Sequence, residues 1–109
     1  MERKIVSQAL KLRFIDAKQV TEAVAGLCIN ANICIGGDIT AALSAAKERE
    51  TSSIARDTLD VLLKNAEAAK NEKLPVCQDT GMVVVFVSVG SNVHIEGDIG
   101  RAINEGVRR

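Results

Sequence analysis

Aromatic side chains are almost missing from this chain, whose 109 residues include two Phe and neither Trp nor Tyr. Two aromatic rings are too few for a platform on which the bases of a single-stranded nucleic acid can stack. Acidic and basic residues balance at 14 each, so no net charge attracts nucleic acid or an anionic membrane surface. We therefore expect neither nucleic acid nor a membrane among the partners of this chain, and we expect an aliphatic core.

Long apolar runs are missing too, since none approaches the ~20 residues that a membrane-spanning helix needs. The charged start Met1-Glu2-Arg3-Lys4 is not followed by the apolar region of a secretory signal. Three cysteines, an odd number at irregular spacing, do not make a disulfide framework. The chain is long enough for one domain at most. These features predict a cytoplasmic protein with reduced thiols.

Apolar residues spaced by three and four predict three helices in the first two thirds of the chain. Asp16 followed by Gln19 has the form of a capping box at the start of the first helix. Gly36-Gly37 is expected to end that helix, and Asp38 to cap the second. The hydroxyl residues Thr51–Ser53 are expected to cap the third.

The last third of the chain predicts strands and one more helix. Met82–Val89 is a continuous apolar run rich in β-branched residues, which is typical of a strand covered on both faces. Residues 90–92 predict a turn and Val93–Ile95 a return strand. Asp98 is expected to cap a final amphipathic helix, and because this helix stops at Arg109 without a C-cap, we expect the polypeptide to continue in its original context. The predicted fold class is α+β: three helices, a short β-hairpin and a final helix, with an exposed apolar surface where further chain or a partner packs.

The most informative motif is Cys77-Gln78-Asp79-Thr80-Gly81, which follows Pro75 and precedes the predicted strand. It places a thiol, an amide, a carboxylate, a hydroxyl and a glycine in consecutive positions of one loop, and such loops often carry function. Cys77 can be a metal ligand, a nucleophile or a small buried residue. Residues 79–81 can equally form a turn that only leads into the strand.

The other cysteines and the single histidine do not complete a metal site in the sequence. Cys28 and Cys34 are six residues apart, a spacing that places them on different faces of a helix, so they are not a chelating pair. His94 lies between two β-branched residues without a histidine partner, which favours a structural role over a zinc ligand. A weaker alternative is a thiol enzyme that uses Cys77 as nucleophile and His94 as base.

With these motifs in view, the sequence resembles the iron–sulfur hydro-lyases that comprise class I fumarate hydratases and L-tartrate dehydratases. The similarity is to the N-terminal portion of the alpha subunit or alpha-type catalytic domain, and it extends from about Leu12 to the C-terminus. It implies an uncertain N-terminal extension at residues 1–15 and the N-terminal part of that catalytic domain at residues 16–109. The residues that carry it are Pro75 with Cys77–Gly81, Val87–Gly90, Glu50–Ser52, Lys64–Ala66, Gly97-Asp98 and Ala102–Arg108.

The resemblance implies that Cys77 is one ligand of a four-iron, four-sulfur (4Fe-4S) cluster, whose other two cysteine ligands lie outside this chain. It also implies that Gln78 and Asp79 contact a small dicarboxylate, with Asp79 as the catalytic residue that holds or exchanges a proton. The reaction is the reversible hydration of fumarate to malate, or the dehydration of tartrate. The implied partners are a beta subunit or a C-terminal domain, and a homo-oligomer.

One thiolate cannot retain a cluster that needs three, so the 109-residue chain alone is expected to be inactive. The alternative of a different class is a helical interaction or assembly module without activity of its own. Under that alternative, the final helix and the apolar run Met82–Val89 serve as docking surfaces.

Overall fold

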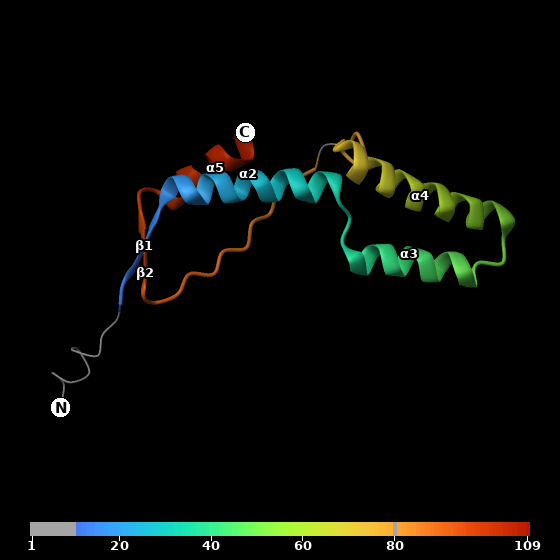
Figure 1. The fold of residues 1–109 in the computed structure, drawn as a ribbon, viewed down its shortest axis with the longest axis horizontal. Helices are drawn as coiled ribbons and strands as arrows, with labels where there is room; N and C mark the ends of the chain where they lie inside the picture. Colours follow the sequence, from blue (N-terminus) through green and yellow to red (C-terminus); the bar gives the residue numbers. More distant parts are fainter. Residues whose placement is uncertain (1–10, 80) are drawn as a thin grey trace, which may run out of the picture. The chain divides into compact units, whose positions relative to one another are not determined.

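The computed structural model describes residues 11–79 and 81–109. Thr80, whose hydroxyl belongs to the predicted site, and residues 1–10 of the predicted N-terminal extension lie outside this range. The α+β class and the order of three helices before a final helix are confirmed (Figure 1). The elements are β1 (Arg13–Asp16), α2 (Ala17–Ile33), α3 (Gly37–Arg49), α4 (Ser53–Glu72), β2 (Val93–Glu96) and α5 (Ile99–Arg108).

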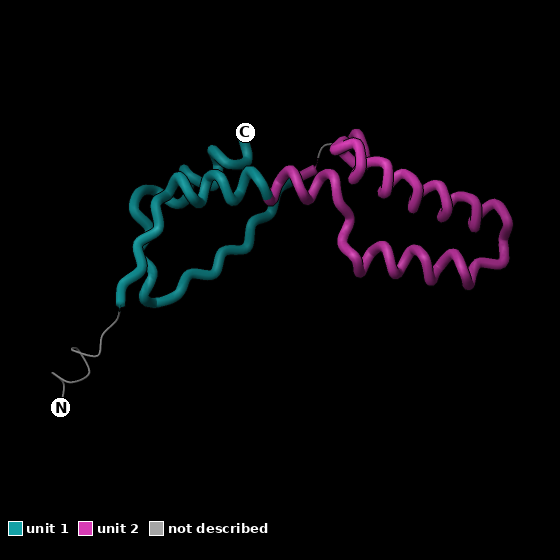
Figure 2. The backbone as a smooth tube through the Cα atoms, viewed as in Figure 1, with its two compact units in different colours: residues 1–26, 82–109 teal, residues 27–81 magenta. Residues whose placement is uncertain are grey.

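The described residues form two compact units, coloured separately in Figure 2. One unit consists of the described residues up to Gly26 together with Met82–Arg109, and we call it the α2–α5 unit. The other is Leu27–Gly81, which we call the α3–α4 unit. Helix α2 belongs to both, because the boundary falls inside it.

Side-chain caps explain where most helices begin. Before α2, the Asp16 carboxylate accepts a hydrogen bond from the Lys18 amide at 2.9 Å, and the Asp16 amide donates to Gln19 Oε1 at 3.1 Å. This reciprocal pair is the predicted capping box. The prediction for Asp38 is wrong, because α3 begins at Gly37 and its cap is Gly36, two residues before Asp38, without a side-chain hydrogen bond. Asp38 lies in the first turn instead, where the helix dipole favours a carboxylate.

Helix α4 starts and ends with well-defined hydrogen bonds. The Ala55 amide donates to Ser52 Oγ at 3.4 Å, so the cap predicted within Thr51–Ser53 is confirmed. At the other end Lys73 adopts a left-handed conformation with φ 55°, and the Leu74 amide donates to the Ala69 carbonyl at 3.0 Å. This geometry closes the last turn and turns the chain away from the helix axis.

The sheet differs from the predicted hairpin. Strands β1 and β2 pair in parallel, with register from Arg13↔Val93 to Asp16↔Glu96. The predicted turn before β2 is present, since the Val93 amide donates to the Gly90 carbonyl at 3.1 Å. Residues 82–89 form no strand, so the hairpin is a wrong prediction. A continuous apolar run indicates burial on both faces, but a strand also needs a hydrogen-bonded neighbour, and the described residues place none beside it.

Helices α2 and α5 pack closely through small residues. The side chains of Thr21 and Val24 are buried, as are Ala102 and Gly106 of α5. Thr21 Oγ1 donates to the Ala102 carbonyl at 2.9 Å. A Cβ added at Gly106 would lie 2.7 Å from both the Thr21 carbonyl oxygen and the Val24 Cβ. Only glycine allows this approach of the two helices.

The run 82–89 leaves its apolar side chains in solvent. Met82 is 90% and Phe86 94% exposed, and the five valines of the run are more than a third exposed. The expectation of an exposed apolar surface is therefore confirmed for this segment.

Within the described residues, one segment, Ala17–Arg49, is long and apolar enough to cross a membrane by length and composition alone. Residues 34–36 interrupt it, so that it consists of the two helices α2 and α3. Core helices of soluble proteins pass the same test, and α2 buries Thr21 and Val24 against α5. The absence of a membrane partner remains a prediction.

Candidate functional site

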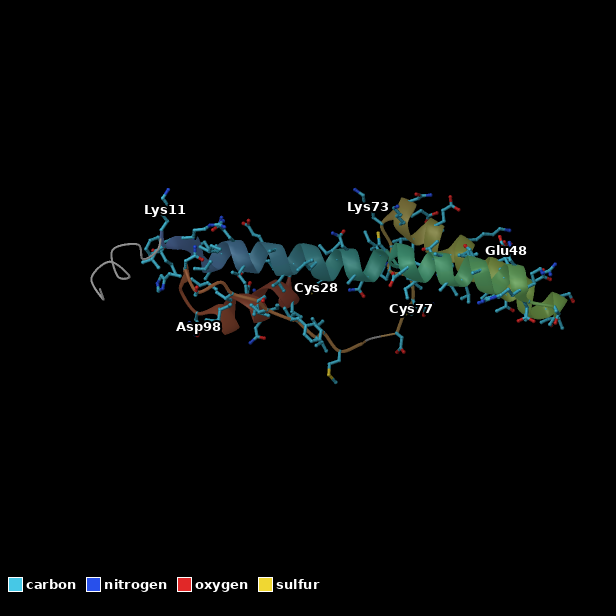
Figure 3. The ribbon with its side chains drawn as sticks, turned by 90° about the horizontal axis from the view of Figure 1, so that it is seen from below. Lys11, Cys28, Glu48, Lys73, Cys77 and Asp98 are labelled. Carbon is cyan, nitrogen blue, oxygen red and sulfur yellow. The ribbon has the colours of Figure 1, made fainter. Side chains whose placement is uncertain are left out.

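The predicted site residues lie on an irregular segment that follows α4 and bends at Val76 and Gln78; Cys77 is labelled in Figure 3. Cys77, Gln78 and Asp79 are all exposed and have no regular secondary structure. Their side chains are therefore available to a ligand, and the reading of Cys77 as a small buried residue is wrong. The three groups are brought together by adjacency in the chain.

The peptide groups just before Cys77 are fixed from two sides within the α3–α4 unit. The Val76 amide donates to the Asn32 carbonyl, near the end of α2, at 2.8 Å. The Val76 carbonyl accepts a hydrogen bond from Asn65 Nδ2 of α4, also at 2.8 Å. Val76 itself is half-buried. The loop is thus anchored at its base, and the reactive side chains begin one residue beyond the anchor.

The Asn32 side chain has a second function in this anchor. Its Nδ2 donates to the Cys28 carbonyl at 2.7 Å. The main-chain carbonyl of Asn32 accepts the hydrogen bond from the Val76 amide. Carbonyls in the last turn of a helix have no partner within the helix. The Asn32 carbonyl is one such group at the end of α2, and the segment that carries Cys77 satisfies it.

The donor set of the described residues fits one ligand position of an iron–sulfur cluster and not the whole group. Cys77 offers an exposed thiol, and a thiolate is the ligand that such clusters require. Among the described residues no group of three or more His, Cys, Asp or Glu side chains could hold a metal ion. Cys28 and Cys34 are half-buried free thiols, and the statement that they form no chelating pair stays a prediction.

His94 has a structural partner. It lies opposite Phe14 in the parallel ladder, and the two rings meet edge to face with centroids 5.7 Å apart. Such pairs stabilise neighbouring strands. His94 belongs to the α2–α5 unit and Cys77 to the α3–α4 unit. The ring contact accounts for His94 without a catalytic role.

An ion-pair cluster joins α3 to α4 in the unit that carries Cys77. Asp60 accepts from Lys47 Nζ of α3 at 2.6 Å and from Lys64 Nζ, one turn further along α4, at 2.7 Å. The hydrogen bond from Lys47, followed by that from Lys64, lowers the pKa of Asp60 from 3.8 to about 2. The cluster helps to fix the two helices against each other, and Asn65 follows Lys64 directly.

Asn65 and Asn32 are the residues around the site that the motif alone did not identify as anchors. A signal for Asn65 exists, since asparagine is a poor helix former whose side chain competes for backbone groups. An asparagine in the middle of a strong helical pattern therefore suggests a partner outside the helix. Asn32 anchors the loop through its main-chain carbonyl. Every residue has such a carbonyl, so the residue type at position 32 could not predict this contact.

The comparison with protein families identifies the class. A family model described as fumarate hydratase (Fumerase) matches residues 21–109, which is most of the chain. The chain therefore belongs to the fumarate hydratase family, and the resemblance inferred from the motifs is confirmed.

The individual relatives are tartrate dehydratase alpha subunits. The putative L(+)-tartrate dehydratase subunit alpha of Methanocaldococcus jannaschii is 32% identical over 93 residues, which cover 84% of this chain and 33% of that protein. The L(+)-tartrate dehydratase subunit alpha of Escherichia coli (strain K12) is 29% identical over 89 residues, covering 82% of this chain and 29% of that protein. The chain thus spans about a third of the length of these curated relatives. No solved structure matches it.

Proposed function

We propose that this chain is part of an iron–sulfur hydro-lyase and contributes one cluster ligand and two substrate contacts. The observation that carries the proposal is an exposed Cys77 on an anchored loop, in a chain that belongs to the fumarate hydratase family. The substrate is a small dicarboxylate such as fumarate or tartrate, in line with the names of the family and of its relatives. The reaction takes place in the cytoplasm, where thiols stay reduced.

The chain's own residues have distinct tasks in this reaction. Cys77 binds one iron as a thiolate. Gln78 donates its amide hydrogens to a substrate carboxylate, a group that accepts such bonds well. Asp79 accepts a proton from the water whose hydroxyl adds to one carbon of the double bond, and an acid outside this chain gives a proton to the other carbon; in the reverse direction Asp79 returns its proton to the departing hydroxyl. A bound cluster supplies Lewis-acid chemistry toward the hydroxyl and one carboxylate of the substrate.

The partners follow from what the chain does not supply. A cluster of this class needs further cysteine ligands, and the described residues offer no group of three ligands. The remaining ligands come from a C-terminal domain or a beta subunit, within a homo-oligomeric enzyme. The alpha-subunit names of the relatives support a partner subunit.

Replacing Cys77 with serine tests the proposal. In the enzyme assembled from the complete alpha-type polypeptide and its beta-type partner, Cys77→Ser should abolish the visible absorbance of the cluster and the hydration of fumarate or dehydration of tartrate. Cys28→Ser is the matched control, because Cys28 is a half-buried thiol on α2. It should keep both cluster and activity. A Cys77→Ser enzyme with full absorbance and activity would refute the proposal.

A second function, a helical assembly module without activity, is favoured by one observation, the exposure of the apolar run 82–89. Co-expression with a beta-type partner separates the two. A complex that forms but contains neither iron nor hydro-lyase activity supports the assembly module. A complex with cluster and activity supports the enzyme.

A further inference from the structure

We propose that Asn65 is the positioning residue for Cys77: its side-chain amide sets the orientation of the peptide group from which the cysteine extends. This inference deepens the proposed function, since it concerns how the same site is held. The observation behind it is the 2.8 Å hydrogen bond from Asn65 Nδ2 to the Val76 carbonyl.

The argument begins with the peptide plane. The Val76 carbonyl oxygen and the Cys77 amide belong to one planar peptide group, and the Cys77 Cα lies in that plane. Fixing the oxygen therefore fixes the direction in which the Cα of Cys77 is placed. Only the two torsions φ and χ1 of Cys77 then separate its sulfur from a rigid frame. A cluster of fixed shape requires each ligand atom at one position. Each torsion that the protein fixes therefore holds the Cys77 sulfur closer to the position of a ligand.

The second step concerns the preceding peptide group. The Val76 amide is held by the Asn32 carbonyl at 2.8 Å. Without Asn65 this bond alone would leave the Val76–Cys77 plane free to rotate about ψ of Val76. The two bonds come from different helices, α2 and α4, so together they define the plane where either one alone does not.

The third step concerns the rigidity of the frame. Asn65 lies in the interior of α4, between the Ser52 cap and the left-handed Lys73. Its neighbour Lys64 is paired with Asp60, which also binds Lys47 of α3. The donor is thus attached to a helix that is fixed at both ends and tied to α3. A loop of exposed polar residues gains its order from this helix, because no side chain of Cys77–Asp79 is buried.

Asparagine suits this position better than its chemical neighbours. Its amide nitrogen donates, whereas an aspartate of the same shape offers only acceptors at neutral pH and would repel the Val76 carbonyl. Alanine removes the donor and, since it is the best helix former, does not weaken α4. The pair Asn65→Ala and Asn65→Asp therefore removes one hydrogen bond in two different ways.

The test measures amide hydrogen exchange, residue by residue, in the metal-free 109-residue chain. In Asn65→Ala the Val76 amide should exchange about fivefold faster, the factor expected for the loss of one neutral hydrogen bond. Backbone order of Cys77 on the fast timescale should fall in the same sample. Amides in the interior of α4 should keep their rates. Asn65→Asp should reproduce this pattern, so that the inference does not depend on a single variant.

The matched control is Asn71→Ala, the same change on the same helix at an exposed asparagine for which the described residues provide no side-chain hydrogen bond. It should leave the Val76 and Cys77 amides unchanged. If Asn65→Ala changes neither amide, the inference is wrong. If it accelerates exchange throughout α4 by the same factor, Asn65 is only a helix-stabilising residue and the inference is wrong as well.

This experiment contains no metal, so its outcome is separate from that of the proposed function. In the complete enzyme, Asn65→Ala should lower the iron bound per protein and leave Cys77 intact as a ligand of the remaining clusters. An enzyme without any cluster would refute the proposed function, while the exchange data would still decide whether Asn65 holds the Cys77 loop.

Discussion

The contacts inside the α2–α5 unit differ in kind from the contacts inside the α3–α4 unit. In the α2–α5 unit the helices meet through buried small residues, with Gly106 against Thr21 and Val24. Among the described residues of the α3–α4 unit only Ala69 is buried, and the contacts that join its parts are caps, ion pairs and the anchor of the Cys77 loop. The first unit depends on shape and the second on polar contacts. The candidate site belongs to the unit that packing constrains least.

The largest effect is expected where shape matters most. Gly106→Ala places a Cβ at 2.7 Å from the Thr21 carbonyl oxygen, which cannot move without shifting α2. Overpacking of this kind costs about 1–3 kcal/mol, and the better helix propensity of alanine offsets ~1 kcal/mol at most. We expect a net loss of about 1–2 kcal/mol in the free energy of unfolding, measured by urea denaturation.

Gly100→Ala is the control for that substitution, because it is the same change on the same helix. An added Cβ there meets only Asp98 Oδ1 at 3.4 Å, an ordinary contact. It should leave stability unchanged or slightly raised. Amide hydrogen exchange shows where the effect lies. Gly106→Ala should raise the exchange rates of amides in α5 and leave those of α4 unchanged. Equal losses from the two glycine variants would mean that the close approach of α2 and α5 contributes nothing.

A smaller effect on the same contact is expected from Thr21→Val. Valine keeps the shape of the buried side chain and removes the hydroxyl that donates to the Ala102 carbonyl at 2.9 Å. The loss of this bond should cost about 1 kcal/mol. Thr58→Val serves as the control in the other unit, since the Thr58 hydroxyl bonds only to the Ile54 carbonyl of its own exposed helix turn. Urea denaturation of both variants should show a loss for Thr21 alone, and a loss of similar size for Thr58 would contradict the contrast between the units.

The same contrast explains which parts of the structure the sequence could predict. Helix starts at Asp16, Ser52 and Asp98 depend on side chains within three residues, and all three were predicted. The Asp38 cap failed by two positions, because Gly36 occupies the N-cap instead and a glycine can fill that position. Contacts between distant residues carry no such local signal. The pairing of β1 with β2 and the bond from Thr21 to Ala102 join residues about 80 positions apart.

For the candidate site, the sequence predicted a loop and not its support. The polar motif after Pro75 left open whether Cys77 is buried, and the structure shows Cys77, Gln78 and Asp79 exposed, without regular secondary structure. The anchors are Asn65, whose partner is a carbonyl 11 residues away, and the main chain of Asn32. A backbone acceptor is present at every position, so no pattern of residue types identifies the one that a loop will use.

The smallest effect is expected from the ion pairs of the α3–α4 unit. Asp60 and Lys47 are about one third exposed and Lys64 is mostly exposed, so water and salt screen the cluster. The pKa of Asp60 is lowered from 3.8 to about 2. A carboxyl group with a lowered pKa contributes stability that is complete above its ordinary pKa and is lost as the pH falls through the lowered value. The contribution of Asp60 should therefore disappear between about pH 4 and pH 2.

Asp60→Asn tests this pH window, with Asp57→Asn as control on the same helix. Asp57 is exposed, and the described residues provide no ion pair for it. The stability difference between Asp60→Asn and the unchanged chain should be small at pH 7, should decrease with added salt, and should vanish near pH 2. Urea denaturation across this range measures it. A difference that stays constant down to pH 2, or an equal one for Asp57→Asn, would mean that the α3–α4 unit does not depend on these charges and that packing holds both units alike.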